Sequence, residues 1–399
     1  MAESGEAHQF AALRGALIEE LQRRGALADE RIAAAFAAVP RHLFLPGVPP
    51  ERAYRDEAII TKAHDGINLS SSSQPAMMAL MLGQLAVEPG QRILEIGAGT
   101  GYNAALLHFL VGARGWVTTI DVDADIVEAA RAALAVSGHA EVATILGDGG
   151  YGYAPDAPYD RIILTVGADD LLPAWVEQLR PDGILVLPLN LGPEMYSIAF
   201  RKLPDGSLIS ESMTPCGFIR LRGAFASAAR TVAVGEWDIH CVPGARLDPV
   251  MLPELLAAEI APAPLPADAL AASLFLAFSG EPLAQLVARA TLAGVPDIRL
   301  ALLDTEAGSG CLLPAWAEGR GGATGAPARC FGRVDAHARL AAHLARWNAL
   351  GRPQAAQLRL HALPRATGAA FPNGWAIERP HATLLLAGRD GRPLTAPAR

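Results

Sequence analysis

The sequence predicts an α/β fold built on a doubly wound, mostly parallel sheet. The first observation is an apolar run, Arg92–Ile96, followed by glycines at alternate positions and then by an Ala/Leu-rich helical pattern that begins at Tyr102. The second is that further apolar runs follow, with helical patterns between most of them. Strands that alternate with helices in this way are typical of a parallel sheet covered by helices on its faces.

Five apolar runs are the candidate strands of this sheet: Arg92–Ile96, Trp116–Ile120, Ala143–Leu146, Arg161–Val166 and Gly183–Leu189. Helical patterns cover Asp123–Ser137 and Asp169–Leu179. Open sheets of this kind bind ligands at the carboxyl ends of their strands, so the residues that follow the runs are the candidate site.

The turn after the first run contains Gly97, Gly99 and Gly101. Glycines let the backbone approach a ligand closely, beside the electropositive N-terminus of the next helix. The spacing is G-x-G-x-G, whereas the dinucleotide fingerprint is G-x-G-x-x-G, and Tyr102 occupies its final position. An ordinary strand-to-helix turn is the alternative interpretation.

Two acidic residues follow later runs. Asp121 ends the second run, about 20 residues past the glycines, where a carboxylate can accept hydrogen bonds from both ribose hydroxyls. Asp148 and Gly149 follow the third run. The combination resembles the Rossmann-like fold of S-adenosyl-L-methionine-dependent methyltransferases.

That resemblance implies a role for each of these positions. The glycine turn would pass the methionyl part of S-adenosyl-L-methionine, Asp121 would hold its ribose, and Asp148 with Gly149 would border its adenine. The expected cofactor-binding set is Glu95, Gly97, Gly99, Gly101, Asp121, Asp148 and Gly149.

Length and composition are those of a globular protein. With 399 residues, 51% of them hydrophobic and 19% charged, the chain is long enough for two domains, which we place at residues 1–230 and 231–399. No apolar run is long enough to cross a membrane, and no secretory signal is visible at the N-terminus, so we expect a cytoplasmic protein without a membrane partner.

The net charge argues against a nucleic-acid-binding protein, and the cysteine spacing argues against a metal-binding or disulfide-bonded protein. The formal net charge is -8 and no basic cluster is present, so nucleic acid is not an expected partner. The four cysteines, Cys216, Cys241, Cys311 and Cys330, are irregularly spaced, without a C-x-x-C pair or a histidine at ligand spacing. We expect reduced, structural cysteines and no metal.

A serine run precedes the glycine turn. Ser70–Ser73 stands just ahead of a helical pattern, Ala76–Leu85, that leads into the first strand. Such a run is commonly a flexible linker or a helix cap, but here it would place hydroxyls near the cofactor's edge of the sheet. Earlier in the chain, His42 lies in a proline-dense segment, and the simpler interpretation of it is a packed, hydrogen-bonded residue.

Residues from Leu17 to about Leu191 resemble the protein-L-isoaspartyl O-methyltransferases. The matching segments are VPRHLF (Val39–Phe44), AYRD (Ala53–Asp56), Ser73-Gln74-Pro75, LEIGAGTGY (Leu94–Tyr102), GDG (Gly147–Gly149), APYDRI (Ala157–Ile162) and the GILVLPL strand. The resemblance implies a peptide carboxylate as methyl acceptor and assigns the catalytic positions to Ser73 and Ser72.

The sequence differs from the repair enzymes of the family in two features, and both affect the functional hypotheses. Repair enzymes of the family carry Thr-Ile-Ser-x-Pro where this chain has Ser71–Pro75, and they end soon after the sheet. Both features resemble relatives that act in ribosomal peptide biosynthesis, such as lanthipeptide and graspetide pathways. The leading hypothesis is therefore methylation of an aspartate in a modified precursor peptide, giving aspartimide and then isoaspartate. The alternatives are repair of isoaspartyl residues in damaged proteins, and a binding protein without activity.

The second half of the chain predicts an α+β domain that recognises the substrate. A hairpin over Met195–Leu203 and Ser207–Met213 is expected to end the catalytic domain. Beyond it we expect helices at Leu283–Leu292 and Ala336–Leu350, strands at Ile298–Leu303, Gln357–Leu363 and Ala382–Leu386, and exposed loops at Ala261–Ala267 and Glu306–Ala328.

Overall fold

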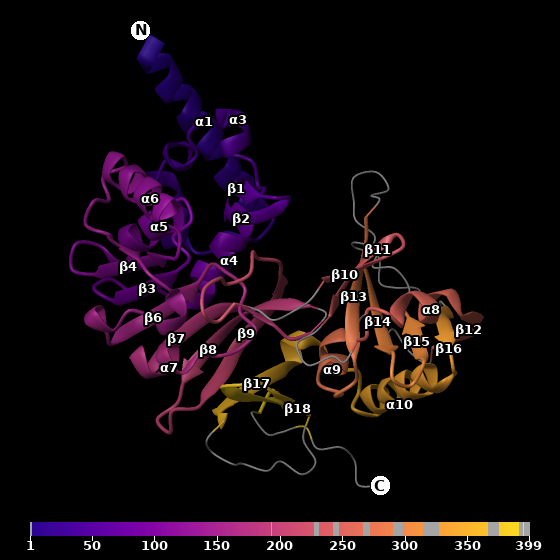
Figure 1. Ribbon diagram of the computed structural model, residues 1–399. Coiled ribbons are helices and arrows are strands. Elements are labelled where there is room, and N and C mark those ends of the chain that lie inside the picture. Colours follow the sequence, from indigo (N-terminus) through magenta and orange to yellow (C-terminus); the bar gives the residue numbers. More distant parts are fainter. Residues whose placement is uncertain are drawn as a thin grey trace. The chain divides into compact units, whose positions relative to one another are not determined.

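The computed structural model describes the chain outside residues 1, 193, 227–230, 242–246, 266–271, 290–297, 314–326, 366–374, 391–393 and 395–399 (Figure 1). The chain separates into two compact units. The first unit is Met1–Leu189 with Ser197–Ala226, and the second unit is Asn190–Tyr196 with Ser227–Arg399.

The sheet of the first unit has the strand order β9-β8-β7-β6-β3-β4-β5. Its strands are β3 (Arg92–Ile96), β4 (Trp116–Asp121), β5 (Ala143–Leu146), β6 (Tyr159–Leu164), β7 (Leu179–Asn190), β8 (Met195–Lys202) and β9 (Leu208–Cys216). The pairs β6–β7, β3–β6, β3–β4 and β4–β5 are parallel, and Figure 1 shows these strands side by side. The expected doubly wound α/β sheet is confirmed, with the β8–β9 hairpin added at one edge.

Helices cover this sheet and bury its apolar strands. Their bounds are α1 (Ala2–Arg23), α2 (Glu30–Ala38), η1 (Arg41–Phe44), α3 (Pro50–Ala53), α4 (Pro75–Leu85), α5 (Tyr102–Val111), α6 (Ala124–Val136), η2 (Gly149–Tyr151), η3 (Ala154–Asp156) and α7 (Pro173–Gln178). Leu106 and Leu107 of α5 are completely buried, as are Ile93 and Leu94 of β3. Removing this much apolar surface from water stabilises the unit.

Local signals fix the ends of these helices. Asp29 caps α2, because its carboxylate accepts hydrogen bonds from the backbone N–H groups of Arg31 (2.7 Å) and Ile32 (3.2 Å). Helix α4 begins at a proline, and the carboxylate of Asp56 accepts a 2.8 Å bond from the N–H of Ala76. The two-stranded sheet of β1 (Ile59–His64) and β2 (Ile67–Ser72) leads directly into α4. The serine run therefore lies between two ordered elements.

The second unit contains a seven-stranded antiparallel sheet with the order β10-β11-β13-β14-β15-β16-β12. These strands are β10 (Thr231–Val234), β11 (Trp237–Cys241), β12 (Glu259–Pro264), β13 (Leu283–Ala288), β14 (Ile298–Asp304), β15 (Ser309–Leu312) and β16 (Pro327–Gly332). Three more strands, β17 (Leu358–Pro364), β18 (Ala376–Glu378) and β19 (Ala382–Gly388), pair in the order β18-β19-β17. The helices are α8 (Leu252–Ala257), α9 (Ser273–Ala277), α10 (Asp335–Ala349) and η4 (Ala355–Gln357). The expected α+β character is confirmed.

Three expectations for this unit are wrong. The apolar spacing of Leu283–Leu292 fits a helix, but Leu283–Ala288 is strand β13 between β11 and β14, with Ala284 and Leu286 completely buried. The expected loop at Ala261–Ala267 falls partly on strand β12, and the expected loop at Glu306–Ala328 contains strand β15. Pairing with neighbouring strands overrides local propensity in each case. Residues 314–326 of that loop lie outside the described residues.

Two kinds of feature are absent from the described part of the chain. No helix there is long and apolar enough to cross a membrane. No group of three or more His, Cys, Asp or Glu side chains there could hold a metal ion.

Candidate active site

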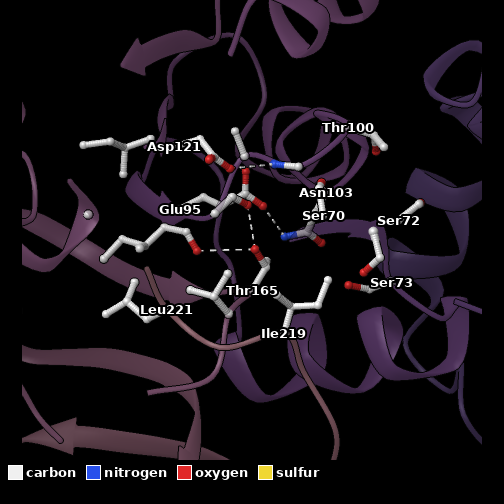
Figure 2. Close-up of a pocket in the computed structure, with 18 of the residues that line it drawn as sticks. Ser70, Ser72, Ser73, Glu95, Thr100, Asn103, Asp121, Thr165, Ile219 and Leu221 are labelled. Atoms are coloured by element: carbon white, nitrogen blue, oxygen red, sulfur yellow. Dashed lines mark hydrogen bonds between the residues drawn. The ribbon is translucent and has the colours of Figure 1, made fainter. Parts of the chain in front are cut away.

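A pocket of about 770 Å³ opens in the first unit at the carboxyl ends of β3, β4 and β6. Among the residues predicted from the sequence, the pocket lining includes Ser72, Ser73, Glu95, Gly97, Gly99, Asp121 and Gly149. Gly101 and Asp148 are not among its lining residues. Figure 2 shows the serines, the acidic residues and Asn103 gathered around one space.

The glycine turn forms the floor of the pocket. Gly97 has φ +99°, and a Cβ placed there would lie 2.6 Å from the hydroxyl oxygen of Thr165, so only glycine fits. Thr165 in turn donates a 2.6 Å hydrogen bond to the carbonyl oxygen of Gly97. Gly99 has φ +52° and presents its backbone beside the serine run. This turn brings the backbone close to any ligand in the pocket.

Gly101 has a different role from the one expected. It is the residue before α5, with φ +84°, and a Cβ there would lie 3.2 Å from the carbonyl oxygen of Ala130 in α6. The glycine therefore allows α5 and α6 to pack closely, and it does not line the pocket. The structure thus gives Gly101 a packing role, and its contact with the cofactor stays a prediction.

Glu95 is a completely buried carboxylate in β3 that borders the pocket. It accepts a 2.6 Å hydrogen bond from the hydroxyl of Thr119 and a 2.8 Å bond from the side-chain amide of Asn103. Burial raises the pKa of Glu95 to about 7, although these two hydrogen bonds act in the opposite direction. A cation bound beside this group would favour its ionised form and lower its pKa.

Asn103 is a pocket residue that reasoning from the sequence missed. Its amide nitrogen is committed to Glu95, and its Oδ1 is buried without a hydrogen-bond partner among the described residues. In Figure 2 it lies between Glu95 and the serines. Its position, two residues after Gly101 in the first turn of α5, is the only signal that could have identified it.

Asp121 stands at the end of β4 with about a tenth of its side chain exposed. Its Oδ2 accepts a hydrogen bond from the N–H of Gly99 (3.3 Å), and its Oδ1 accepts one from the N–H of Asp123 (3.2 Å). Burial raises the pKa of Asp121, while these backbone donors lower it. Each oxygen keeps a lone pair for a ligand hydroxyl.

Asp148 does not reach the pocket, because its carboxylate is used elsewhere. It accepts hydrogen bonds from the N–H of Gly150 (2.8 Å) and the N–H of Ala224 (2.7 Å). A Cβ at Gly223 would lie 2.3 Å from its Oδ2. Asp148 therefore holds the chain segment around Gly223 in place, whereas we expected it to border the cofactor. Its neighbour Gly149 does line the pocket.

The two predicted catalytic serines differ in their surroundings. Ser72 is buried, and its hydroxyl accepts a 3.3 Å hydrogen bond from the guanidinium of Arg41. Arg41 also donates a 3.0 Å bond to the carbonyl oxygen of Ser73. The hydroxyl of Ser73 makes no hydrogen bond to another described residue. Ser73 is thus the hydroxyl that remains available to a ligand.

One wall of the pocket comes from a segment distant in sequence, which the sequence analysis did not assign to the site. Ile219–Arg222 follows β9 and is anchored to Gly167, whose N–H donates to Ile219 O and whose carbonyl accepts from Leu221 N, both at 2.8 Å. The guanidinium of Arg222 then donates two hydrogen bonds, of 3.0 and 2.9 Å, to the carboxylate of Asp123. His42, by contrast, lies outside the pocket lining, stacked on Phe10 and hydrogen-bonded to Tyr54, as the packed interpretation predicted.

These residues fit S-adenosyl-L-methionine. Its ammonium and sulfonium are cations that suit the buried carboxylate of Glu95, and an ammonium N–H suits the unpaired Oδ1 of Asn103. Its ribose hydroxyls suit Asp121. Gly97 and Gly99 line the pocket with backbone, which lets a ligand lie close against the turn.

Comparison with known proteins agrees with this reading of the pocket. The protein-L-isoaspartate(D-aspartate) O-methyltransferase family profile matches residues 12–225. A protein-L-isoaspartate O-methyltransferase of Methanopyrus kandleri is 36% identical over 215 residues, which are 54% of this chain and 93% of the relative. One of Hyperthermus butylicus is 35% identical over 224 residues, covering 54% of this chain and 91% of the relative.

A solved structure described as a protein-L-isoaspartate O-methyltransferase is similar in fold over 87% of this chain and 96% of its own, with a TM-score of 0.53 and 24% identity. Its coverage of this chain extends well beyond the first unit. The relatives of Methanopyrus kandleri and Hyperthermus butylicus, by contrast, match only about half of the chain, so the role of the second half stays a prediction. By its sequence match and its pocket, the chain belongs to the protein-L-isoaspartate(D-aspartate) O-methyltransferase family and is an S-adenosyl-L-methionine-dependent carboxyl O-methyltransferase.

Proposed function

We propose that this enzyme methylates the free α-carboxylate of isoaspartyl residues in proteins and peptides. The observation that carries the proposal is the family match over residues 12–225, which includes the whole pocket. From the sequence alone, an aspartate of a modified ribosomal peptide is the leading hypothesis for the substrate and isoaspartyl repair is the alternative. The family match and the names of the relatives support the second hypothesis better.

The chemistry of the acceptor suits this pocket. In an isoaspartyl residue the main chain runs through the side-chain carboxyl, so the α-carboxylate is left free. S-adenosyl-L-methionine supplies a methyl group on a positively charged sulfur. Transfer of that methyl to a carboxylate oxygen turns a cation and an anion into two neutral products, so no strong acid or base is required. The enzyme must align the two groups and exclude water.

Each residue of the pocket then has a defined task. Glu95 and Asn103 bind the ammonium of the cofactor, and Asp121 binds its ribose. The hydroxyl of Ser73 donates a hydrogen bond to the acceptor carboxylate and directs its other oxygen at the methyl group. Ser73 suits this task because its hydroxyl has no other partner among the described residues. Arg41 holds the backbone of Ser73 and acts only as a positioning residue.

The methyl ester that leaves the enzyme is activated for a second step. The backbone nitrogen of the following residue attacks the ester carbonyl, the new N–C bond closes a five-membered imide, and the C–OCH₃ bond breaks. The amide proton leaves with the methoxy group as methanol. This step needs no group on the enzyme.

The second unit has no assigned chemistry, and we propose that it adds contacts to the substrate. A cytoplasmic location likewise stays a prediction. The pocket lies entirely in the first unit, so its assignment depends on neither statement.

The test of substrate class offers two peptides in parallel and follows both by mass spectrometry. A linear isoaspartyl peptide should gain one methyl group, and a cyclised precursor-type peptide with an ordinary aspartate should not react. A chain that ends after Ala226 should still bind the cofactor but show a higher KM for the peptide. Methylation of the cyclised peptide alone, followed by loss of methanol, would contradict the proposal and restore the ribosomal peptide hypothesis.

A further inference from the structure

A groove on the first unit adjoins the active-site pocket and is separate from it. It has an open volume of about 1330 Å³, and it shares Ser70, Gly99 and Thr100 with the pocket lining. The two spaces therefore adjoin at the glycine turn and the serine run. A ligand held in the pocket could therefore extend toward the groove at this point.

One wall of the groove is a stripe along α6. Asp125, Ile126, Ala129, Ala132, Ala133 and Val136 recur every three to four residues and so lie on one face of the helix. The three alanines leave room above the helix because their side chains are small. The other face of α6, which carries Val127, Ala130 and Leu134, is buried in the core. Within the groove stripe, Ile126 is also buried and Ala133 packs against the core, whereas Ala129, Ala132 and Val136 are exposed.

The opposite walls are also mostly apolar. They come from the segment Leu43–Val48 and from Ile60–Lys62 of β1. Ile60 is 45% exposed and Val136 is 74% exposed, although both are large apolar residues. Exposed apolar surface of this kind in a concave site is typical of a binding surface.

The charges of the groove are largely compensated. Lys62, its one cation, donates 2.8 Å hydrogen bonds to the carboxylates of both Asp123 and Asp125. A strongly charged ligand would find no free counter-charge there. An apolar side chain on an otherwise neutral peptide segment fits this lining better.

We infer that the groove binds the substrate polypeptide beside the isoaspartate and takes an apolar side chain of a flanking residue. The inference rests on the proposed function, because an acceptor that is part of a polypeptide must continue out of the pocket. The groove adjoins the pocket at Ser70, Gly99 and Thr100 and offers a mostly apolar lining. Peptides with leucine or valine near the isoaspartate should therefore bind better than peptides with serine there.

The chain offers two matched pairs of variants for a test. Ala132 and Ala135 are both exposed residues of α6, but only Ala132 lines the groove. Ile60 and Ile67 are both exposed isoleucines of the β1–β2 hairpin, but only Ile60 lines the groove. Ala132→Trp fills the groove and Ile60→Ser removes an apolar contact, while Ala135→Trp and Ile67→Ser control for folding and for general surface effects.

The experiment measures the anisotropy of a fluorescein-labelled isoaspartyl peptide with a flanking leucine, titrated with full-length protein and S-adenosyl-L-homocysteine. Ala132→Trp and Ile60→Ser should weaken binding by about tenfold, as expected for the loss of one buried apolar side chain, and both controls should bind like wild type. Replacing the flanking leucine of the peptide by serine should weaken binding to the wild-type protein to a similar degree. The same replacement should not change the affinity of the Ala132→Trp variant for the peptide.

Equal binding by all four variants would overturn the inference, as would wild-type binding that ignores the flanking residue. A change in oligomeric state for Ala132→Trp with unaltered peptide binding would also overturn it, since the groove would then seat a second copy of the chain. Methylation of the same peptide is measured separately. Groove-dependent binding without methylation would count against the proposed function and not against the groove.

Discussion

The guanidinium of Arg41 donates a 3.0 Å hydrogen bond to the carbonyl oxygen of Ser73, from a side chain that is completely buried. The same group donates to Ser72 Oγ and to the carbonyl oxygens of Arg55 and Glu57. One buried cation thus ties the serine run to the segment that precedes β1. The position of the catalytic hydroxyl depends on this arrangement and not on the serines alone.

Arg41→Lys should therefore impair both stability and catalysis. A lysine cannot reproduce the fork of donors, and leaving several buried carbonyl groups unpaired should lower the free energy of unfolding by about 2 kcal/mol or more. Arg24→Lys is the control, because Arg24 is 55% exposed and its ion pair with Asp56 should contribute less than about 1 kcal/mol. Urea unfolding of the two variants measures the difference. Equal losses would mean that Arg41 does not organise this region.

The raised pKa of Glu95 should make cofactor binding depend on pH. The ordinary pKa of 4.5 is raised to about 7 in the folded protein, so the folded state holds more protons than the unfolded chain between these values. The contribution of Glu95 to the free energy of unfolding is therefore full below pH 4.5 and is lost as the pH rises to about 7. A bound cation favours the ionised carboxylate, so cofactor affinity should rise with pH up to about 7 and level off above it.

Titration calorimetry in two buffers of different ionisation enthalpy measures this effect. Binding of S-adenosyl-L-methionine should release protons at about pH 6 and almost none from Glu95 at about pH 8.5. Glu95→Gln should bind more weakly and lose the release at the lower pH. Proton release that is the same in wild type and Glu95→Gln would show that Glu95 does not face the cofactor's cation.

Asp121 should govern affinity for the cofactor through its ribose. Asp121→Ala removes hydrogen bonds to a charged group and should weaken binding by about 1.5–3 kcal/mol. Gly99→Val should be at least as harmful, because φ +52° is unfavourable for a branched side chain that would also enter the pocket. Glu128→Ala, an exposed carboxylate of α6, is the control. Calorimetry that finds all three variants alike would contradict the assignment of Asp121.

Ser73 should act on the acceptor and not on the cofactor. Ser73→Ala should slow methylation by about 10- to 100-fold through the loss of one hydrogen bond to a carboxylate, while cofactor affinity stays near that of wild type. Ser70→Ala is the comparison, because the Ser70 hydroxyl accepts a bond from Thr61 and serves the β1–β2 hairpin. Similar losses of rate in both variants would indicate that the whole run is structural.

The residues that could be predicted are those whose position in the fold follows from the pattern of their neighbours in the sequence. The glycine turn, Asp121 and Ser73 each follow or precede a recognisable strand or helix pattern, so their place at one edge of the sheet follows from the topology. Their separate roles could not be predicted. Gly101 has a packing role because α6 approaches it closely, and its sequence neighbours do not reveal that contact. The hydroxyl of Ser72 is hydrogen-bonded and that of Ser73 is not, because of where Arg41 lies in the fold.

Other parts of the site depend on contacts between segments that are distant in sequence. Leu221 reaches the pocket because it is anchored to Gly167, and no local pattern in Ile219–Arg222 reports that contact. Asn103 gains its role from Glu95 across the turn. In the second unit, the spacing of Leu283–Leu292 fits a helix as well as a strand, and only the pairing with β11 and β14 decides between them.

The most direct test of the account compares two linear peptides of identical sequence, one with isoaspartate and one with aspartate at the same position. The measurement is kcat/KM for methyl transfer from S-adenosyl-L-methionine to each peptide. The pocket is proposed to align a free α-carboxylate, so the isoaspartyl peptide should be favoured by about 100-fold or more. Equal values for the two peptides, or a preference for aspartate, would contradict the central claim.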